Sequence, residues 1–323
     1  MGPDPIFQRC YYYLTYRCNS RCRYCDIWRT VRLLREEQGA NVVRRRIDEL
    51  KQLGVSYIDF TGGEVLLRDD LVEILSHAKG QGFPTIFVTN GLIYKKRADE
   101  LLGVADFINF SLDTLDRQDY AARRGVDALP HVISAMEYAA EIGQQFGIIA
   151  TIDDGNIDSI EPLAELAGKF GTQVSINPVF SYFGNPELAR DAVRRIKDAA
   201  SHPAVYVNEA QLDLIASGGN DIDSPSCRAM SRNIVISPDG YLLMPCFHHQ
   251  MDRQYIEGGI CEALESKAAA TMRGNEGRFP FCRGCTINCY MDTANLRIEE
   301  LLKGTVTITE RRPRCSRGPA RRW

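Results

Sequence analysis

The sequence is poor in several features that would mark a membrane or nucleic-acid-binding protein. No apolar run reaches the roughly 18 residues that a membrane-spanning helix needs. The opening "MGPDPIFQRC" lacks the basic start and apolar core of a signal peptide. The net charge is only −3, so no overall positive field attracts DNA or RNA, and we expect no nucleic-acid partner. These absences make the cytoplasm the expected location.

Cysteine is also missing from a long stretch, between Cys25 and Cys227, although the chain has eleven cysteines in all. All of them lie either in residues 10–25 or in residues 227–315. Such a lopsided distribution does not suit the disulfide framework of a small secreted domain. It predicts two separate metal sites, with Cys10 and Cys261 outside both as buried free thiols.

Short apolar runs alternate with helical patterns from residue 10 to about residue 200. Runs rich in aromatic and β-branched residues predict strands, and apolar residues at helical spacing predict helices. The expected strands are 10–17, 56–63, 85–91, 106–113, 146–153 and 173–180, and the expected helices are 41–54, 71–82, 97–105, 129–143, 159–171 and 186–201. Six β-α units in series predict an α/β fold with parallel strands, either a barrel or an open sheet, whose chemistry collects at the carboxyl ends of the strands.

Three cysteines follow the first expected strand in "YRCNSRCRYCDIW" (16–28), with the spacing C-x3-C-x2-C. Cys18, Cys22 and Cys25 can hold three irons of a four-iron cluster and leave the fourth iron open. An open coordination position separates catalytic metal sites from structural ones. From these residues alone, a zinc site completed by a distant cysteine or histidine remains the alternative.

The same stretch, with an aromatic residue before its third cysteine, resembles the cluster motif of the radical S-adenosylmethionine (SAM) superfamily. "TGGE" (61–64) is similar to the family's glycine-glycine-glutamate signature, although Val65 stands where the family often has proline. "SLD" (111–113), "RRG" (123–125) and "TIDDGN" (151–156) resemble further family segments. The resemblance implies a partial (β/α)6 barrel over residues 8–205, a SAM-binding [4Fe-4S] cluster, and SAM contacts from Tyr24, Gly62, Gly63, Glu64, Asn90, Ser111, Asp113, Arg124 and Asn156. A helix cap at Asp113 and a surface charge at Arg124 are the alternatives for those two residues.

Beyond residue 205 a second cysteine group follows a predicted β-hairpin, "NIVISPDGYLLMPC" (233–246). Together with "CRGCTINC" (282–289) it resembles the auxiliary-cluster modules called SPASM or twitch, and implies a small cysteine-rich domain over residues 206–310. We expect one auxiliary [4Fe-4S] cluster on Cys227, Cys246 and two of Cys282, Cys285 and Cys289, with Cys315 serving a second cluster or none. A structural zinc ribbon is the alternative. Residues 311–323, with six arginines, predict a disordered basic tail.

The resemblance implies an enzyme that cleaves SAM to a 5′-deoxyadenosyl radical, which takes hydrogen from a small molecule, a cofactor precursor or a peptide. Such an enzyme needs a reducing partner such as flavodoxin or ferredoxin. Because the first strand begins by residue 10, we expect that any leader of a peptide substrate would need a separate partner protein. His248 and His249 follow Cys246 and are weak candidates for proton donation near neutral pH. The competing hypothesis is a non-catalytic iron–sulfur protein for electron transfer or sensing.

Overall fold

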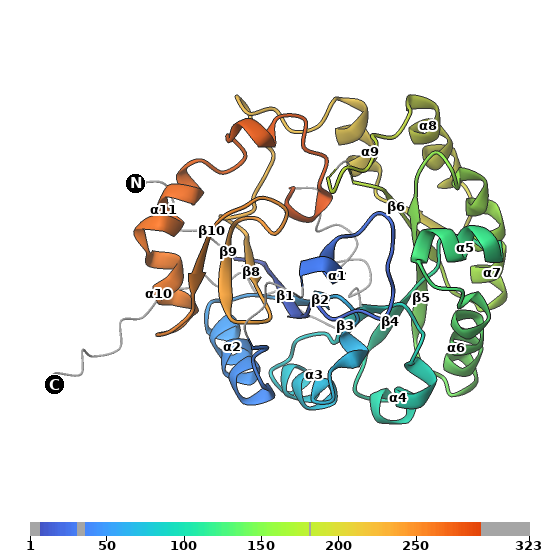
Figure 1. The fold of residues 1–323 in the computed structure, drawn as a ribbon, viewed down its shortest axis with the longest axis horizontal. Coiled ribbons are helices and arrows are strands. Elements are labelled where there is room, and N and C mark those ends of the chain that lie inside the picture. Colours follow the sequence, from blue (N-terminus) through green and yellow to red (C-terminus); the bar gives the residue numbers. More distant parts are fainter. Residues whose placement is uncertain (1–6, 31–35, 181, 292–323) are drawn as a thin grey trace.

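The computed structural model describes residues 7–30, 36–180 and 182–291. Its strands form one ten-stranded sheet in the order β10-β9-β8-β1-β2-β3-β4-β5-β6-β7. The strands β1 to β7 pair in parallel in chain order, and the sheet curves into a partial barrel (Figure 1). Their bounds are β1 Arg9–Thr15, β2 Tyr57–Gly62, β3 Ile86–Thr89, β4 Phe107–Ser111, β5 Phe146–Ile152, β6 Val174–Pro178, β7 Val205–Val207, β8 Asn233–Ile236, β9 Tyr241–Pro245 and β10 Gln250–Tyr255.

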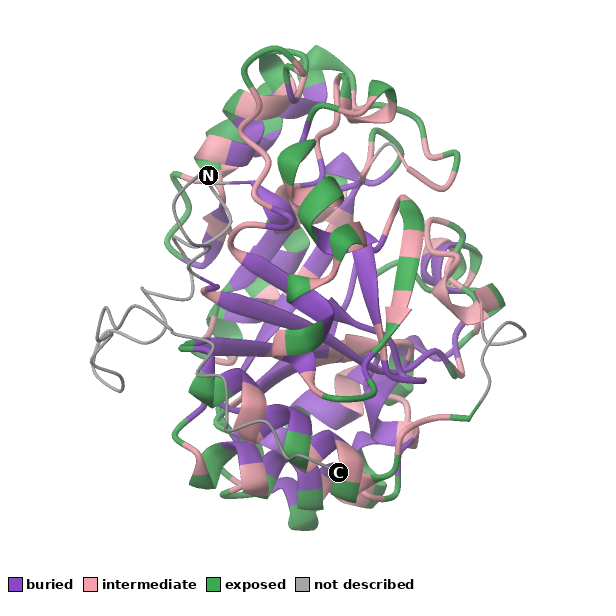
Figure 2. Cartoon of the chain, turned by 90° about the vertical axis from the view of Figure 1, so that its left-hand side faces the viewer, coloured by how far each residue is buried: buried purple, intermediate pink, exposed green. Residues whose placement is uncertain are grey.

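Most helices surround the outer face of the barrel, whereas α1 lies at the centre of the view in Figure 1. Their bounds are α1 Ile27–Thr30, α2 Ala40–Gln52, α3 Leu71–Gly80, α4 Tyr94–Leu101, α5 Arg117–Arg124, α6 Leu129–Glu141, α7 Ile160–Lys169, α8 Arg190–Ala199, α9 Glu209–Ala216, α10 Ile260–Glu265 and α11 Lys267–Gly274. In Figure 2 most strands are buried along their length, whereas the helices are exposed on one side; strand β10 is the exception, since all its residues are exposed or intermediate. The main hydrophobic core therefore lies between the sheet and the helices.

Helix α2 illustrates how the sequence pattern produces this packing. Val43, Ile47 and Leu50 recur at helical spacing and are all buried against the sheet. Each such burial contributes about 1.5–3 kcal/mol relative to an exposed side chain. The helix ends where Gly54 adopts a φ of 79°, which an L side chain rarely adopts, and the chain turns into β2.

The structure confirms the expected α/β fold and its six β-α units, with differences at several elements. Helix α4 begins at Tyr94, three residues before the expected start at residue 97, and α5 was not expected. The β-α alternation also continues past residue 205 into β7 and α9. Short elements such as these carry too few apolar residues for a clear periodic signal.

The expected hairpin is formed by β8 and β9, which pair in antiparallel orientation. Strand β8 also pairs in parallel with β1, with Arg9 opposite Asn233 and Tyr12 opposite Ile236. The C-terminal cysteine segment therefore packs on the same sheet that forms the barrel, through a second hydrophobic cluster that contains Tyr11, Val235 and Cys246. Cys315, the tail at 311–323 and the last part of the expected cysteine-rich domain lie outside the described residues.

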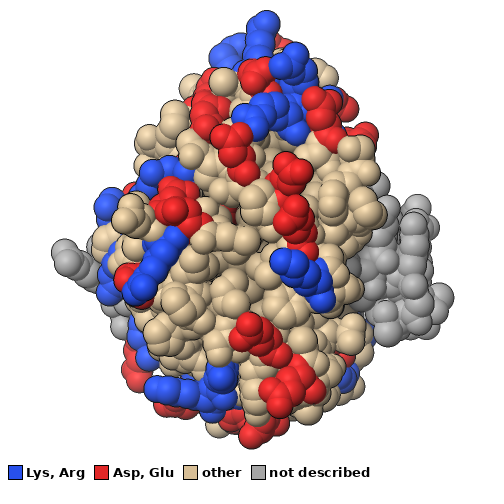
Figure 3. Space-filling view, turned by 90° about the vertical axis from the view of Figure 1, so that its right-hand side faces the viewer, with Lys and Arg blue, Asp and Glu red and all other residues tan. Residues whose placement is uncertain are grey.

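No helix among the described residues is long and apolar enough to cross a membrane. On the face shown in Figure 3, basic and acidic side chains are interspersed rather than gathered by sign.

Candidate active site

The three cysteines of the first group lie in the loop between β1 and α1, at the carboxyl end of β1. Helix α5 holds the backbone of this loop, because the amides of Arg21 and Arg23 donate to the carbonyls of Arg124 and Arg123, both at 2.9 Å. Gly125 ends that helix with a φ of 66°. A Cβ atom there would lie 2.5 Å from the carbonyl oxygen of Arg21, so the close approach requires glycine.

The glycine pair after β2 packs against the start of the same loop. A Cβ atom on Gly62 would lie 2.0 Å from the Thr15 carbonyl oxygen, and one on Gly63 would lie 2.1 Å from that of Arg17. The amides of Gly63 and Glu64 donate to these two carbonyls at 2.8 Å. The two glycines thus bring two segments of the chain itself together, in addition to lining the cavity described next.

A cavity of about 230 Å³ opens beside the cysteine loop. Most of the residues expected to act together line it: Cys18, Cys22, Tyr24, Cys25, Gly62, Gly63, Glu64, Asn90, Ser111 and Arg124. Burial raises the pKa of Cys18 to about 11 and that of Cys25 to about 12. These thiols are therefore protonated without a metal, and a metal must displace their protons when it binds.

Glu64 and Asn90 form hydrogen bonds that connect the segments lining this cavity. The Glu64 carboxylate is buried and accepts from the Leu66 amide at 3.1 Å, the Thr89 hydroxyl at 2.8 Å and the Asn90 amide at 2.7 Å. Burial raises its pKa, while these donors partly offset the rise. The Asn90 side chain donates to the Asn19 side chain at 2.7 Å, which links the end of β3 to the cysteine loop.

Asp113 and Arg124 form a buried pair behind the cavity wall. Arg124 Nη2 donates to Asp113 Oδ1 at 2.7 Å, and the Tyr24 hydroxyl donates to Asp113 Oδ2 at 2.6 Å. Arg124 is 6% exposed, so it is not a surface charge, and Asp116 rather than Asp113 caps α5. Arg124 Nη1 lies 3.9 Å from Cys22 Sγ. A positive charge is thereby held beside the three cysteines.

Asp113 and Asn156 do not line the cavity. Asn156 is 3% exposed, and its amide donates to the backbone carbonyls of Asp113 and Thr151, both at 3.0 Å. Both residues therefore stabilise the segments that line the cavity without lining it themselves.

A neighbouring hydrogen-bond network that the sequence did not reveal centres on Asp153. Its carboxylate accepts from Arg23 at 2.8 Å and from Arg123 at 2.9 Å.

The residues at this site fit the [4Fe-4S] cluster and SAM that the resemblance implies. Three thiols offer three iron ligands and leave one iron open. Two buried donors of residues that line the cavity, Arg124 Nε and Trp28 Nε1, have no hydrogen-bond partner within the part of the chain that the structure describes. Since buried donors are nearly always paired, these two are available to a bound group.

A second cavity, of about 380 Å³, occupies the interior of the barrel, and we call it the barrel cavity. Tyr24 and Cys25 line both this cavity and the first one. The barrel cavity extends from these residues to Cys289, and strands β1, β2, β5 and β6 contribute to its wall. Its lining residues are Arg9, Tyr11, Tyr24, Cys25, Asp59, Ile149, Thr151, Asn177, Pro178, Val179, Phe180, Tyr182, Asn185, Gln211, Asn288 and Cys289.

Four cysteines of the second group affect the pKa values of their neighbours within the group. Besides burial, Cys246 and Cys285 raise the pKa of Cys227, and Cys285 and Cys282 raise the pKa of Cys246. Cys289 faces the barrel cavity instead, where burial raises its pKa to about 11 with a further contribution from Asp59. Among the described residues, no three histidine, cysteine or acidic side chains lie close enough to hold a single metal ion.

The two cysteines expected outside both groups differ from each other. Cys10 is completely buried and free, as expected. Cys261 is partly buried and disulfide-bonded, so the expectation of a buried free thiol was wrong for it.

The two histidines after Cys246 lie among aromatic rings. The His248 ring centroid is 3.9 Å from that of Tyr182, and burial lowers the pKa of His248 to about 3. His249 stacks on Phe281 at 4.4 Å, and burial lowers its pKa as well. A histidine with a pKa near 3 is neutral at pH 7, which disfavours the proton donation expected of His248.

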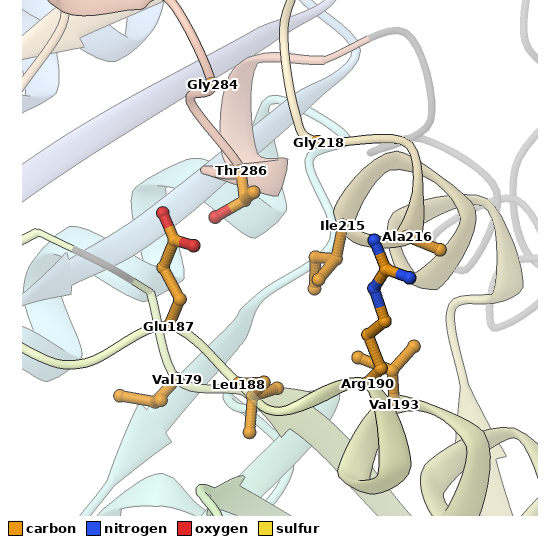
Figure 4. Close-up of a pocket in the computed structure, with 10 residues that line it drawn as sticks. All are labelled: Val179, Glu187, Leu188, Arg190, Val193, Ile215, Ala216, Gly218, Gly284 and Thr286. Atoms are coloured by element: carbon orange, nitrogen blue, oxygen red, sulfur yellow. The ribbon is translucent and has the colours of Figure 1, made fainter.

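A third pocket, of about 480 Å³, opens on the outside between α8, α9 and the segment that carries Cys285. Figure 4 shows the Glu187 carboxylate pointing toward Thr286, with Arg190 on the opposite side beside Ile215. Val179 lines both this outer pocket and the barrel cavity. The outer pocket therefore lies next to the barrel interior.

Comparison with known proteins finds a family similarity in the part of the chain that carries the site. Residues 12–167 match the radical SAM superfamily. A probable GTP 3′,8-cyclase of Pyrococcus abyssi is 33% identical over 161 residues, which are 48% of this chain and 51% of that protein. The chain thus spans about half the length of this curated relative.

Two solved structures share the fold. Streptococcus suis SuiB bound to S-adenosylmethionine has a TM-score of 0.68 at 18% identity, over 87% of this chain and 69% of SuiB. The histidine-tagged anSMEcpe with bound AdoMet has a TM-score of 0.60 at 14% identity, over 83% of this chain and 82% of anSMEcpe.

Proposed function

We propose that the chain, whose residues 12–167 match the radical SAM superfamily, is an enzyme that cleaves SAM reductively and performs radical chemistry on a substrate in the barrel cavity. One observation carries the proposal. Tyr24 and Cys25 line both the cavity beside the three cysteines and the barrel cavity. The two cavities are therefore adjacent, which is the arrangement that a radical generated in the first would need in order to act on a substrate in the second.

A bound [4Fe-4S] cluster and SAM would supply one-electron reductive chemistry and a radical able to abstract hydrogen. The chain would position and shield these groups. Cys18, Cys22 and Cys25 would hold the cluster, and Arg124 places a positive charge 3.9 Å from Cys22 Sγ. Asp113 keeps Arg124 and the Tyr24 hydroxyl in place by two hydrogen bonds.

For the second cysteine group we propose one auxiliary [4Fe-4S] cluster on Cys227, Cys246, Cys282 and Cys285. The contributions of Cys246, Cys282 and Cys285 to the pKa values of their neighbours in this set support this assignment, because they indicate that these side chains lie near one another. Four protein thiolates close such a cluster, so its role is electron transfer or support of the substrate site. Cys289, which faces the barrel cavity, is left out of the cluster.

The barrel cavity indicates a small polar substrate or one residue of a peptide. Among its described lining residues Arg9 is the one basic side chain and Asp59 the acidic one, which does not suit a triphosphate such as GTP, despite the name of the relatives. We propose that the substrate enters through the outer pocket, because Val179 lines both spaces. A longer substrate such as a peptide would leave its remainder in that pocket.

We also propose a reducing partner such as flavodoxin or ferredoxin as the source of the electron, and the cytoplasm as the location. A non-catalytic electron-transfer protein is the second candidate. An electron-transfer protein does not require two adjacent cavities with Tyr24 and Cys25 in both walls. This pair of cavities therefore favours the enzyme.

The test is anaerobic. The protein is reconstituted with iron and sulfide, SAM and dithionite are added, and 5′-deoxyadenosine is measured. We expect 5′-deoxyadenosine from the wild type and none from Cys22→Ala. Cys246→Ala is the matched control and should retain a first cluster whose EPR spectrum changes when SAM is added. If the wild type forms no 5′-deoxyadenosine and SAM leaves its spectrum unchanged, the proposed function is wrong.

A further inference from the structure

A carboxylate in the barrel cavity has no donor from the described part of the chain. Asp59 lies in β2 between Ile58 and Phe60, which are both completely buried. Since side chains alternate along a strand, Asp59 points away from these two and lines the barrel cavity. No described residue donates a hydrogen bond that affects the pKa of the Asp59 carboxylate. The Asp59 carboxylate therefore faces the cavity without a hydrogen bond from these residues.

Arg9 is the nearest source of positive charge, and it is already engaged elsewhere. Its Nη1 donates to the Tyr11 hydroxyl at 2.6 Å, and its guanidinium lies 5.3 Å from the centroid of the Tyr57 ring. Burial raises the pKa of Asp59, and Arg9 offsets only part of that rise. Arg9 influences Asp59 through its charge and not through a hydrogen bond.

A second, independent feature of the same cavity also lacks a partner. Gln211, from α9, is 2% exposed, and its Nε2 makes no hydrogen bond to any residue that the structure describes. It lines the barrel cavity together with Asp59, although the two residues come from distant parts of the chain. Leaving a buried amide unsatisfied costs about 1–3 kcal/mol, so such a group is rarely left without a partner in a native structure.

We propose that Asp59 binds a cationic group of the substrate, an ammonium or a guanidinium, and that the Gln211 amide binds a polar group of the same molecule. This inference rests on the proposed function, which puts the substrate in the barrel cavity. A charge-assisted hydrogen bond to Asp59 would compensate the partly buried carboxylate. An acceptor on the ligand would pair the Gln211 amide. The substrate class is then an amine or guanidine that also carries a carbonyl or hydroxyl group.

The test measures binding rather than turnover. The probes are n-butylammonium, glycinamide and the neutral n-butanol, titrated calorimetrically into the anaerobic protein loaded with clusters and SAM. We expect the two cations to bind the wild type at least about tenfold more tightly than they bind Asp59→Asn, and n-butanol to show no such difference. Asp69→Asn removes an exposed carboxylate that lines neither the barrel cavity nor the outer pocket and is the matched control, which should bind all three probes as the wild type does.

Gln211→Leu separates the two contacts. It should weaken glycinamide, which has a carbonyl acceptor, and leave n-butylammonium unchanged. If Asp59→Asn does not fold, Asp59→Glu replaces it, since it keeps the charge and should keep the preference for n-butylammonium over n-butanol. Equal binding of n-butylammonium and n-butanol to the wild type, or of n-butylammonium to wild type and Asp59→Asn, overturns the inference.

The outcome is distinguishable from that of the proposed function. Formation of 5′-deoxyadenosine without cation binding leaves the enzyme proposal standing and removes the role of Asp59. Cation binding at Asp59 without any SAM cleavage leaves the role of Asp59 standing and removes the enzyme proposal.

Discussion

The guanidinium of Arg124 donates a hydrogen bond of 2.7 Å to the carboxylate of Asp113, and both side chains are buried. The same carboxylate accepts from the Tyr24 hydroxyl, and the other arm of the guanidinium approaches Cys22 Sγ. One ion pair thus connects the end of β4, the end of α5 and the cysteine loop. The geometry of the first cavity depends on it.

Asp113→Ala should lower the free energy of unfolding by about 3–5 kcal/mol, because it leaves Arg124 as an uncompensated buried charge. Urea unfolding of the cluster-free protein measures the loss. Asp127→Ala is the control, since it breaks an exposed pair with Arg117 and should leave the unfolding midpoint unchanged. A loss for Asp113→Ala no larger than that of the control would contradict the assigned role.

Gly125→Ala should destabilise the protein and also reduce the iron bound by the cysteine loop. The added Cβ atom would lie 2.5 Å from the Arg21 carbonyl oxygen, so the loop has to move. Gly171→Ala is a matched control: its φ of 65° is almost the same as the 66° of Gly125, but nothing described lies within 4 Å of the added atom. The left-handed backbone costs each variant about 1–2 kcal/mol.

Thermal unfolding and iron content after reconstitution distinguish these two glycine variants. Gly125→Ala should bind less iron than the wild type and should unfold at a lower temperature than Gly171→Ala, whereas Gly171→Ala should keep its iron. Equal iron content in the two variants would show that the contact with Arg21 does not position the loop.

Cys246→Ala should lower the iron content from about eight to about four per chain, because it removes one of four ligands of the auxiliary cluster. Cys289→Ala should keep about eight, since its side chain faces the barrel cavity and is not a cluster ligand. Iron analysis of the anaerobically reconstituted proteins makes the comparison. Iron loss in Cys289→Ala and not in Cys246→Ala would reverse the ligand assignment.

Asp153→Asn should destabilise the protein in a pH-dependent way. Burial alone would raise the pKa of Asp153, but the hydrogen bonds from Arg123 and Arg23 outweigh it and lower that pKa below its usual value of 3.8. A carboxylate with a lowered folded-state pKa stabilises the fold above its unfolded pKa and loses that contribution as the pH falls through the folded value. The difference between wild type and variant should therefore be constant at neutral pH and shrink below about pH 4.

Urea unfolding of the cluster-free proteins over this pH range gives the measurement. Asp69→Asn, at an exposed position, is the control and should differ little from the wild type at any pH. A difference for Asp153→Asn that grows on acidification would have the wrong sign.

Much of the site follows from local sequence. The spacing of Cys18, Cys22 and Cys25 identifies the cluster loop, and the positions of Glu64, Asn90 and Ser111 after their strands place them on one rim. Trp28 and Thr89 were missed, although each lies next to a motif: Trp28 in the cysteine stretch and Thr89 directly before Asn90. Adjacency to a motif was the available signal for both.

The sequence by itself determined the order of β-α units, the rim where the chemistry collects and the grouping of the cysteines, because these depend on periodicity and spacing along one chain. Only the tertiary structure decided that Asp113 supports the rim from behind, that β8 pairs with β1, and that Asp59 and Gln211 share a cavity. Periodicity fixes the face of a strand on which a side chain lies. The curvature of the sheet then determines which distant residue lies opposite, and that curvature comes from all strands packing together.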